Sequence, residues 1–422
     1  ATSLIQRYLP PDSTWTAKFI DAVPFIVIAL VLLYNLARRG RVGEADGWGG
    51  ALDKAITPQG ESRLAGTVTR AAESASLNFV GGFAGPLVLV VVAAALPLIL
   101  GGYWVGLCAQ AFAYGLIFLS WTLVTGEGGM LWLCQITFAG VGAITTAQLA
   151  NNHGWPVLAA VVAGGLVALV MGAVIGFLSI RLGDLYVALV TLAFGLLIEN
   201  LVFTLPRFVN QGIGMTINRP GFAASDVKYT YLVLVAFVFV ALFIVNFRRS
   251  TTGLALNAAR SSPAGATTSG ISTVQMKVIA GALAALIAGI GGGLLTLAQT
   301  SFQPSEFATF AGIVWLAVLV TIGIRSVAAA LVAGLAFTML PALSQAYLPA
   351  WTGNVLPVLF GLGAISAARY PDGILAEQGR RLRRLLLRLG ASGDPEFADV
   401  VSQEPIEVPS LDAATMMAQR VS

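Results

Sequence analysis

Residues 248–277 read RRSTTGLALNAARSSPAGATTSGISTVQMK, and the predicted fold is arranged around this stretch. It lies between two strongly apolar runs, yet it is polar, rich in small residues and compatible with helix. Segments that are buried in a core or in lipid are predominantly apolar. We therefore interpret the stretch as an exposed docking segment, with an ordinary connector as the alternative.

The rest of the chain has the composition of a membrane protein. Of its 422 residues, 57% are hydrophobic and 10% are charged, too few ionisable groups to cover a soluble surface of this size. Runs of about 20 apolar residues, enough to cross a hydrocarbon core as helix, recur from end to end. The short alternating segments of a membrane β-barrel are not found. The predicted fold is an all-α, polytopic transmembrane helical bundle.

Eleven runs are long enough to be spans. They cover residues 19–37, 79–100, 103–125, 130–150, 157–180, 185–204, 229–247, 276–298, 307–323, 327–346 and 351–367. Lysine and arginine are enriched on the cytoplasmic side of membrane proteins. If the N-terminus is outside and the C-terminus is cytoplasmic, only these of the 24 Lys and Arg residues fall outside: Arg7, Lys18, Arg207, Arg219 and Lys228. This topology places residues 248–277 in the cytoplasm.

The apolar runs and the polar segments between them divide the chain into four parts. Residues 1–37 are an extra N-terminal transmembrane helix, and residues 38–78 are a mixed-charge cytoplasmic linker. Residues 79–376 form the main transmembrane domain. Residues 377–422 form a cytoplasmic tail that is first basic and then disordered.

Glycine is abundant, with 47 residues, and several glycines are spaced four residues apart. The pairs are Gly81 with Gly85, Gly172 with Gly176, and Gly289 with Gly293. Such spacing lets helix backbones approach closely in membranes. We expect packing seams within one bundle, and a seam between two copies is the alternative.

The sequence lacks the motifs of several enzyme classes. It has no phosphate-binding loop of the Walker type, and with His153 as its single histidine it has no H-E-x-x-H motif or Ser-His-acid set. Cys108 and Cys134 fall in apolar segments and are expected to be reduced packing residues. We predict no catalytic residue, no metal site and no cofactor, and the charge distribution does not predict nucleic-acid binding.

The run Gly126-Glu127-Gly128-Gly129 frees the backbone to turn between two apolar runs, and the run that follows is polar for a lipid-facing helix. We predict that a translocation pathway is lined by Gly126, Gly128, Gly129, Gln135, Thr137 and Thr191. The alternative is that these groups only pair helices. Glu199 is either an intramembrane acid or a solvated helix end, and its place near the end of an apolar run favours the latter.

Three stretches resemble permease subunits of branched-chain amino acid ABC transporters, of the LivM type. They are residues 126–143 (GEGGMLWLCQ, continued by FAGVGA from Phe138), residues 181–194 (RLGDLYVALVTLAF) and Pro371-Asp372-Gly373-Ile374. Residues 248–277 resemble the cytoplasmic loop of the same family. The residues that carry this likeness are Gly253, Ala258, Arg260, Ala264 and Gly270. The resemblance covers roughly residues 80–376.

The resemblance implies an importer of branched-chain or related small amino acids or amides in the bacterial inner membrane. Its expected partners are a sister permease, two cytoplasmic subunits that bind and hydrolyse ATP, and an extracytoplasmic substrate-binding protein. In the family, the cytoplasmic loop forms a short coupling helix in a cleft of the ATPase. The external loop with Asn210, Gln211, Gly212 and Gly214 is expected to receive the substrate.

The sequence departs from the family at two places. Acidic residues that are usual in the coupling loop are replaced by Ser261, Pro263 and Thr267, so docking is expected to rest on shape and backbone contacts. A later Gly-Gly-x-Gly-Ser motif survives only as residues 323–326 (GIRS), and its arginine suggests an altered cytoplasmic contact.

Residues 1–37 resemble the last span of the sister permease, which suggests the second half of a fused double permease. A genuine extra N-terminal span is the alternative to this fusion. For the whole chain, the alternatives from other functional classes are an ATP-independent carrier or channel and a non-transporting membrane scaffold.

Overall fold

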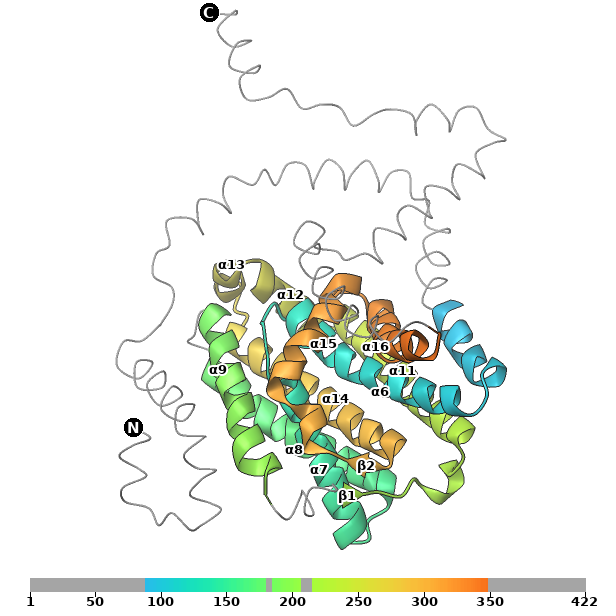
Figure 1. The fold of residues 1–422 in the computed structure, drawn as a ribbon. Coiled ribbons are helices and arrows are strands. Elements are labelled where there is room, and N and C mark those ends of the chain that lie inside the picture. Colours follow the sequence, from blue (N-terminus) through green and yellow to red (C-terminus); the bar gives the residue numbers. More distant parts are fainter. Residues whose placement is uncertain (1–87, 180–183, 206–214, 348–422) are drawn as a thin grey trace, which may run out of the picture. The chain divides into compact units, whose positions relative to one another are not determined.

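A computed structural model describes residues 88–179, 184–205 and 215–347 (Figure 1). All of them belong to one compact unit of the chain, Ala1–Gly373, and the second unit is Ile374–Ser422. Several predictions lie outside the described residues: the spans at 19–37 and 351–367, the linker 38–78, the tail 377–422, the pair Gly81 and Gly85, and the external loop with Asn210, Gln211, Gly212 and Gly214.

The described part is predominantly helical. After a first helix, Val88–Ile99, its α-helices are α6 (Tyr103–Trp121), α7 (Gln135–Asn152), α8 (Val157–Leu178), α9 (Asp184–Ile198), α11 (Asp226–Arg249), α12 (Thr251–Ser261), α13 (Pro263–Thr268), α14 (Thr273–Gln299), α15 (Thr309–Ile322) and α16 (Val327–Tyr347). Two of these helices continue as π-helix, α6 into η1 (Thr122–Glu127) and α9 into η3 (Glu199–Phe203).

Six helical segments of the described residues are long and apolar enough to cross a membrane. They are Tyr103–Glu127, Val157–Leu178, Tyr186–Phe203, Asp226–Arg249, Thr273–Gln299 and Val327–Tyr347. Each agrees with a predicted run to within three residues at either end. Val88–Ile99 and Thr309–Ile322 are shorter apolar helices. A polytopic helical bundle is therefore confirmed for this part of the chain.

Helix α14 lies at the centre of the described bundle and packs against α6, α7 and α8 (Figure 1). Its backbone approaches that of α7 where Gly289 meets Gly142, so closely that a Cβ on Gly142 would collide with the Gly289 backbone. Because lipid does not drive helices together, small residues that permit such contact stabilise the bundle. Seams within the chain are confirmed for Gly172, Gly176, Gly289 and Gly293, which all face neighbouring helices.

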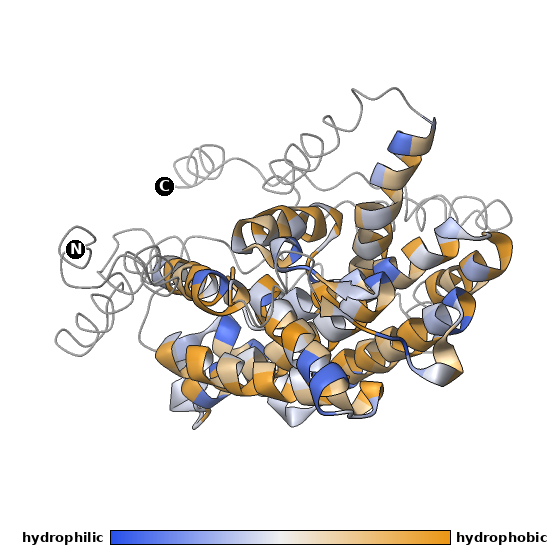
Figure 2. Ribbon diagram, turned by 60° about the horizontal axis from the view of Figure 1, so that its bottom comes forward, coloured by the Kyte–Doolittle hydropathy of each residue, from blue (hydrophilic) through white to orange (hydrophobic). Residues whose placement is uncertain are grey.

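The outward sides of the outer helices are apolar. On α8 the exposed line is Val162, Leu166 and Val170, and on α11 the side chains of Val235 and Phe239 are 68% and 73% exposed. Figure 2 shows apolar residues along the helices and hydrophilic ones mainly at their ends and connections. These faces have the character of a surface that meets lipid or another membrane subunit.

One predicted boundary is wrong. The run 130–150 was expected to be helical throughout, but α7 begins only at Gln135, and α7 is not among the six apolar spans. Two backbone groups of residues 130–134 bond to side chains instead. The Trp132 carbonyl accepts a hydrogen bond from Trp121 Nε1 at 3.0 Å, and the Leu133 amide donates one to Thr191 Oγ1 at 3.1 Å. These bonds replace the helical ones that a membrane segment otherwise needs.

The strand pair is a second feature that the all-α prediction does not contain. Strand β1 (Met215–Thr216) pairs antiparallel with β2 (Ser301–Phe302), with Met215 opposite Phe302. The pair joins two connectors that were both expected outside the membrane. Helix α11 runs from this strand end of the bundle to α12, and its 24 residues span roughly 36 Å at about 1.5 Å per residue.

The two cysteines lie where the sequence placed them. Cys108 and Cys134 are free and buried, which confirms their assignment as packing residues. His153 is exposed in the short turn after α7, where its Nδ1 lies 3.4 Å from the Gln148 carbonyl oxygen.

Candidate functional site

The predicted docking segment folds into two short helices, α12 and α13, and a serine caps the start of each. Ser250 accepts a hydrogen bond from the Gly253 amide at 3.2 Å, and Ser262 accepts one from the Gly265 amide at 3.2 Å. Ser272 caps α14 in the same way. A serine at this position satisfies an amide that a helix start leaves unpaired. The expectation of a helical segment is confirmed.

Helix α12 has one buried and one exposed side. Gly253, Leu256 and Ala259 face the bundle, and a Cβ on Gly253 would collide with the Phe247 carbonyl of α11. The opposite side exposes Thr251, Leu254, Asn257 and Ser261, and Leu254 is 60% exposed. This exposed side carries no acidic residue.

Gly270 separates α13 from α14. Its φ of 78° lies in the left-handed region, and the next amide, that of Ile271, bonds back to the Ala266 carbonyl at 2.9 Å. This is a glycine-terminated helix end. Gly270 therefore has a structural role in the segment, while Ala258 lies half-buried on α12 and Ala264 lies in α13.

The helix pair α12–α13 meets the bundle at the glycine-rich break. Arg260 Nη1 donates a hydrogen bond to the Gly126 carbonyl at the end of η1. A methyl at Gly129, whose φ is +69°, would lie 3.0 Å from Arg260 Cγ. Burial lowers the pKa of Arg260, the charge of Arg325 acts in the same direction, and Glu127 opposes both. Two separately predicted groups of residues thus lie in contact.

A second arginine joins the same place. Arg248 at the end of α11 forms an ion pair with Glu127 at 2.7 Å and donates to the Arg325 carbonyl at 2.6 Å. The turn between α15 and α16 is also close, since a Cβ on Gly126 would lie 2.7 Å from the Ile324 carbonyl oxygen. We call these contacting residues the arginine cluster: Gly126, Glu127, Arg248, Arg260 and Arg325.

The other predicted pathway residues lie deeper in the bundle. Gln135, Thr137 and Thr191 are fully buried. Ser120 Oγ lies 3.4 Å from Gln135 Oε1, and Thr191 receives the hydrogen bond from the Leu133 amide. The structure therefore brings Thr191 onto the non-helical segment that precedes α7, while Gly126 to Gly129 lie at the arginine cluster.

Sequence reasoning missed a group of residues at the start of α15. Glu199 Oε2 accepts a hydrogen bond from the Thr309 amide at 2.7 Å, so Glu199 caps α15 rather than ending a solvated helix. The Oγ1 atoms of Thr137 and Thr309 are buried and have no hydrogen-bond partner among the described residues. A Cβ on Gly195 would lie 2.9 Å from Thr137 Oγ1 and 3.1 Å from Thr309 Oγ1. The four-residue spacing of Thr191, Gly195 and Glu199 could have revealed this polar face.

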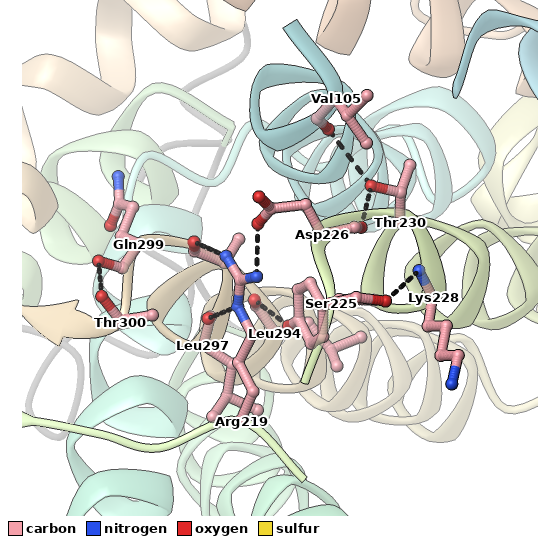
Figure 3. Close-up of polar contacts among 12 residues, drawn as sticks. Val105, Arg219, Ser225, Asp226, Lys228, Thr230, Leu294, Leu297, Gln299 and Thr300 are labelled. Carbon is pink, nitrogen blue, oxygen red and sulfur yellow. Dashed lines mark hydrogen bonds and ion pairs between the residues drawn. The ribbon is translucent and has the colours of Figure 1, made fainter. Parts of the chain in front are cut away.

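Near strands β1 and β2, Arg219 links the end of α14 to the start of α11 (Figure 3). Its Nη2 and Nε donate to the carbonyls of Ala298 and Leu297 at 2.8 and 3.1 Å, at the end of α14. Its Nη1 lies 2.5 Å from Asp226 Oδ1 at the start of α11, and its guanidinium lies over the Tyr229 ring at 4.9 Å. The sequence had marked Arg219 only as an outside charge.

The chain is similar to known membrane transport components. The family described as branched-chain amino acid transport system / permease component matches residues 103–363. The permease protein LivM of the high-affinity branched-chain amino acid transport system of Salmonella typhimurium is 29% identical over 265 residues. The Escherichia coli K12 protein of the same name is 28% identical over 263 residues. Each alignment covers 56% of this chain and 62% of the relative.

The chain thus spans about 62% of the length of these curated relatives. No solved structure matches it significantly. The long apolar helices and the relatives together identify a multi-pass protein of the bacterial inner membrane. The chain belongs to the family of permease components of branched-chain amino acid transport systems.

Proposed function

We propose that the chain is the membrane-spanning permease subunit of an ABC importer for branched-chain or related small amino acids or amides. The names of the two LivM relatives and the family match support this substrate class. The chain works with a sister permease, two cytoplasmic ATPases that bind the ATP, and an extracytoplasmic substrate-binding protein, and it catalyses no reaction itself. It crosses the membrane eleven times, with its N-terminus outside and its C-terminus cytoplasmic.

The observation that carries this proposal is the arginine cluster. Helix α12 exposes one face to a partner and holds the end of η1 through the bond from Arg260 to Gly126. A rigid displacement of α12–α13 by an ATPase therefore reaches η1 directly, and through Arg248 it also reaches the turn before α16. Hydrogen bonds from a charged donor of this kind are stronger than neutral ones, which suits them to hold the two segments together.

Helix α15 extends this connection into the bundle. The turn that follows it contains Ile324, which lies against Gly126, and Arg325, a member of the cluster, and the first residue of α15, Thr309, is bonded to Glu199. Gln135, Thr137 and Thr191 are buried in the bundle, away from the arginine cluster. In the proposed mechanism of alternating access, these three residues line the pathway. Gly126, Gly128 and Gly129 belong to the cytoplasmic end of the same pathway.

The identity of the transporter is tested by uptake of radiolabelled L-leucine into membrane vesicles that contain this chain with its sister permease and binding protein. The ATPases are either included or omitted. The proposal predicts uptake only with the ATPases and with ATP on their side of the membrane. Uptake without ATPases would instead indicate an ATP-independent carrier or channel, and the absence of both uptake and ATPase association would indicate a scaffold.

The docking face of α12 is tested at Leu254, which is 60% exposed. Leu254→Asp places a charge in an apolar contact, and we expect the amount of ATPase that copurifies with the chain to fall by about tenfold, as for loss of an interface anchor. Leu254→Met keeps an apolar side chain of similar volume and serves as the matched control. Equal copurification of the ATPase with all three proteins would contradict docking through this face.

A further inference from the structure

The polar face of α9 contains three residues in one line. Thr191, Gly195 and Glu199 follow one another at intervals of four residues, which places them on the same side of a helix. Thr191 accepts from the Leu133 amide, Gly195 faces the hydroxyls of Thr137 and Thr309, and Glu199 accepts from the Thr309 amide. We call Thr191, Gly195 and Glu199 the α9 stripe.

The hydroxyls opposite the stripe, like that of Thr125 in η1, are buried without a partner, whereas most buried threonine hydroxyls of the described helices are paired. Thr146, Thr296 and several others bond to a carbonyl of their own helix, four residues earlier. Thr137 and Thr309 lie in the first turns of α7 and α15, where no such carbonyl is in reach, and their Oγ1 atoms have no partner among the described residues. Unpaired buried hydroxyls are unfavourable, so a state in which water or a ligand reaches them is stabilised relative to this one.

The chemistry of the stripe suits both ends of an α-amino acid. The first turns of α7 and α15 carry partial positive charge, which together with the two free hydroxyls favours a carboxylate. Glu199 offers a carboxylate to an ammonium group a short distance away, because it already reaches the Thr309 amide at 2.7 Å. Among the α9 stripe, Thr137 and Thr309, Glu199 is the only acidic residue.

We propose that the α9 stripe, with Thr137 and Thr309, is the point on the translocation route where the permease itself recognises the ammonium and carboxylate groups of an amino acid. The inference rests on the proposed import function. In the described conformation the site is closed, since a Cβ on Gly195 would lie 2.6 Å from Thr309 Cγ2. Separation of α9 from α7 and α15 opens it.

Accessibility of single cysteines tests the opening of the stripe in the complete transporter. Cys108 and Cys134 are first replaced by alanine, and Thr137→Cys and Thr309→Cys are then introduced one at a time. Thr296→Cys is the matched control, because Thr296 is equally buried but its hydroxyl bonds to the Gly292 carbonyl at 3.0 Å. A charged, membrane-impermeant thiosulfonate is applied with and without ATP and vanadate.

We expect Thr137→Cys and Thr309→Cys to react at least about tenfold faster than Thr296→Cys in one nucleotide state, and L-leucine to slow the reaction. If wild type imports leucine in the same vesicles but neither cysteine reacts faster than the control, the stripe is not on the route and the import function stands. If the cysteines react but wild type imports no leucine, the assignment of an amino acid ligand is wrong.

The charge of Glu199 is tested separately from its capping bond. Glu199→Gln keeps an oxygen that can accept from the Thr309 amide but removes the charge, and Glu199→Asp keeps the charge. We expect the maximal rate of leucine uptake to fall about tenfold or more in Glu199→Gln and to be largely retained in Glu199→Asp. ATP hydrolysis and assembly are expected to change by less than about twofold in both. A purely structural cap predicts that Glu199→Gln behaves like wild type.

Discussion

Single arginine side chains connect the docking segment and the end of α11 to the rest of the bundle. The last carbonyls of a helix have no partner within that helix and carry partial negative charge, so they attract a cation. Arg260 meets such a carbonyl at Gly126, at the end of α6 and η1, and Arg248 meets the Arg325 carbonyl beyond α15. Each arginine thereby fixes the end of one membrane helix to a segment that comes from elsewhere in the chain.

Glu306 tests how the burial of one carboxyl group affects the stability of the fold. It lies in the 3-10 turn η6 (Pro304–Phe307), and its Oε2 atom is buried with no partner among the described residues. Burial raises the pKa of Glu306, and a hydrogen bond from Gln299 opposes this in part. Because the pKa is higher in the folded than in the unfolded chain, the folded state binds its proton more tightly. The resulting stability is complete below the unfolded pKa and is lost as the pH rises through the folded pKa.

We therefore expect Glu306→Gln to raise the thermal unfolding temperature of the purified protein in detergent at pH 7.5. A neutral amide resembles the protonated acid, so the difference from wild type is expected to shrink as the pH falls to 4.5. The measurement is a pair of unfolding curves at each pH. A variant that is less stable than wild type at pH 7.5, or a difference that is constant with pH, would show that burial does not dominate at Glu306.

At the scale of elements, both candidate sites lie where an α-helix passes into π-helix. Helix α6 ends in η1 beside the arginine cluster, and α9 ends in η3, which begins with Glu199. Single π-helical turns often occur at functional sites, because they shift side chains and backbone groups out of the regular helical register. In this bundle the two turns place Glu127 and Glu199 against other helices.

The seam between α7 and α14 predicts an asymmetric response to added methyl groups. Gly142→Ala forces a Cβ into the Gly289 backbone, and we expect a loss of about 1–3 kcal/mol in unfolding free energy from overpacking. Gly106→Ala in α6 is the matched control, because no atom lies within 4 Å of its Cβ position. Thermal or denaturant unfolding of both variants measures the difference. Equal stability of the two variants would contradict the close backbone approach described for this seam.

Hydropathy predicted the spans well and their connections less well. The six long apolar helices were found because their lengths are set by the membrane. The start of α7 was misplaced because the Leu133 amide bonds to Thr191, a partner 58 residues away that local sequence does not reveal. Strands β1 and β2 were missed for the same reason, since each has only two residues and pairs across the chain with the other.

For the whole molecule, the two candidate sites are joined by one short helix. The 14 residues of α15 span roughly 21 Å at about 1.5 Å per residue, from Thr309 near the α9 stripe to the turn at the arginine cluster. A packed helix transmits displacement along its length better than a flexible loop does, because its backbone bonds are internal. This arrangement lets a displacement of α12–α13 and the opening of the α9 stripe occur together.

Sequence reasoning assigned two residues of the arginine cluster to different sites. Gly126 was predicted to line the pathway, and Arg260 was predicted to belong to the docking segment. The structure brings Arg260 to Gly126 across 134 residues of sequence. No pattern in one sequence shows such a contact, because it depends on how α6, α11 and α12 pack at the end of the bundle.

The most direct test of the central claim measures leucine import and ATP hydrolysis in the same proteoliposomes, with wild type, Arg260→Lys and Arg260→Ala transporters. Arg260→Ala removes the bond to the Gly126 carbonyl and leaves the exposed face of α12 unchanged. We predict that it still binds the ATPases and hydrolyses ATP, but imports about tenfold less leucine per ATP, with Arg260→Lys intermediate. An unchanged ratio of leucine imported to ATP hydrolysed in Arg260→Ala would contradict coupling through the arginine cluster.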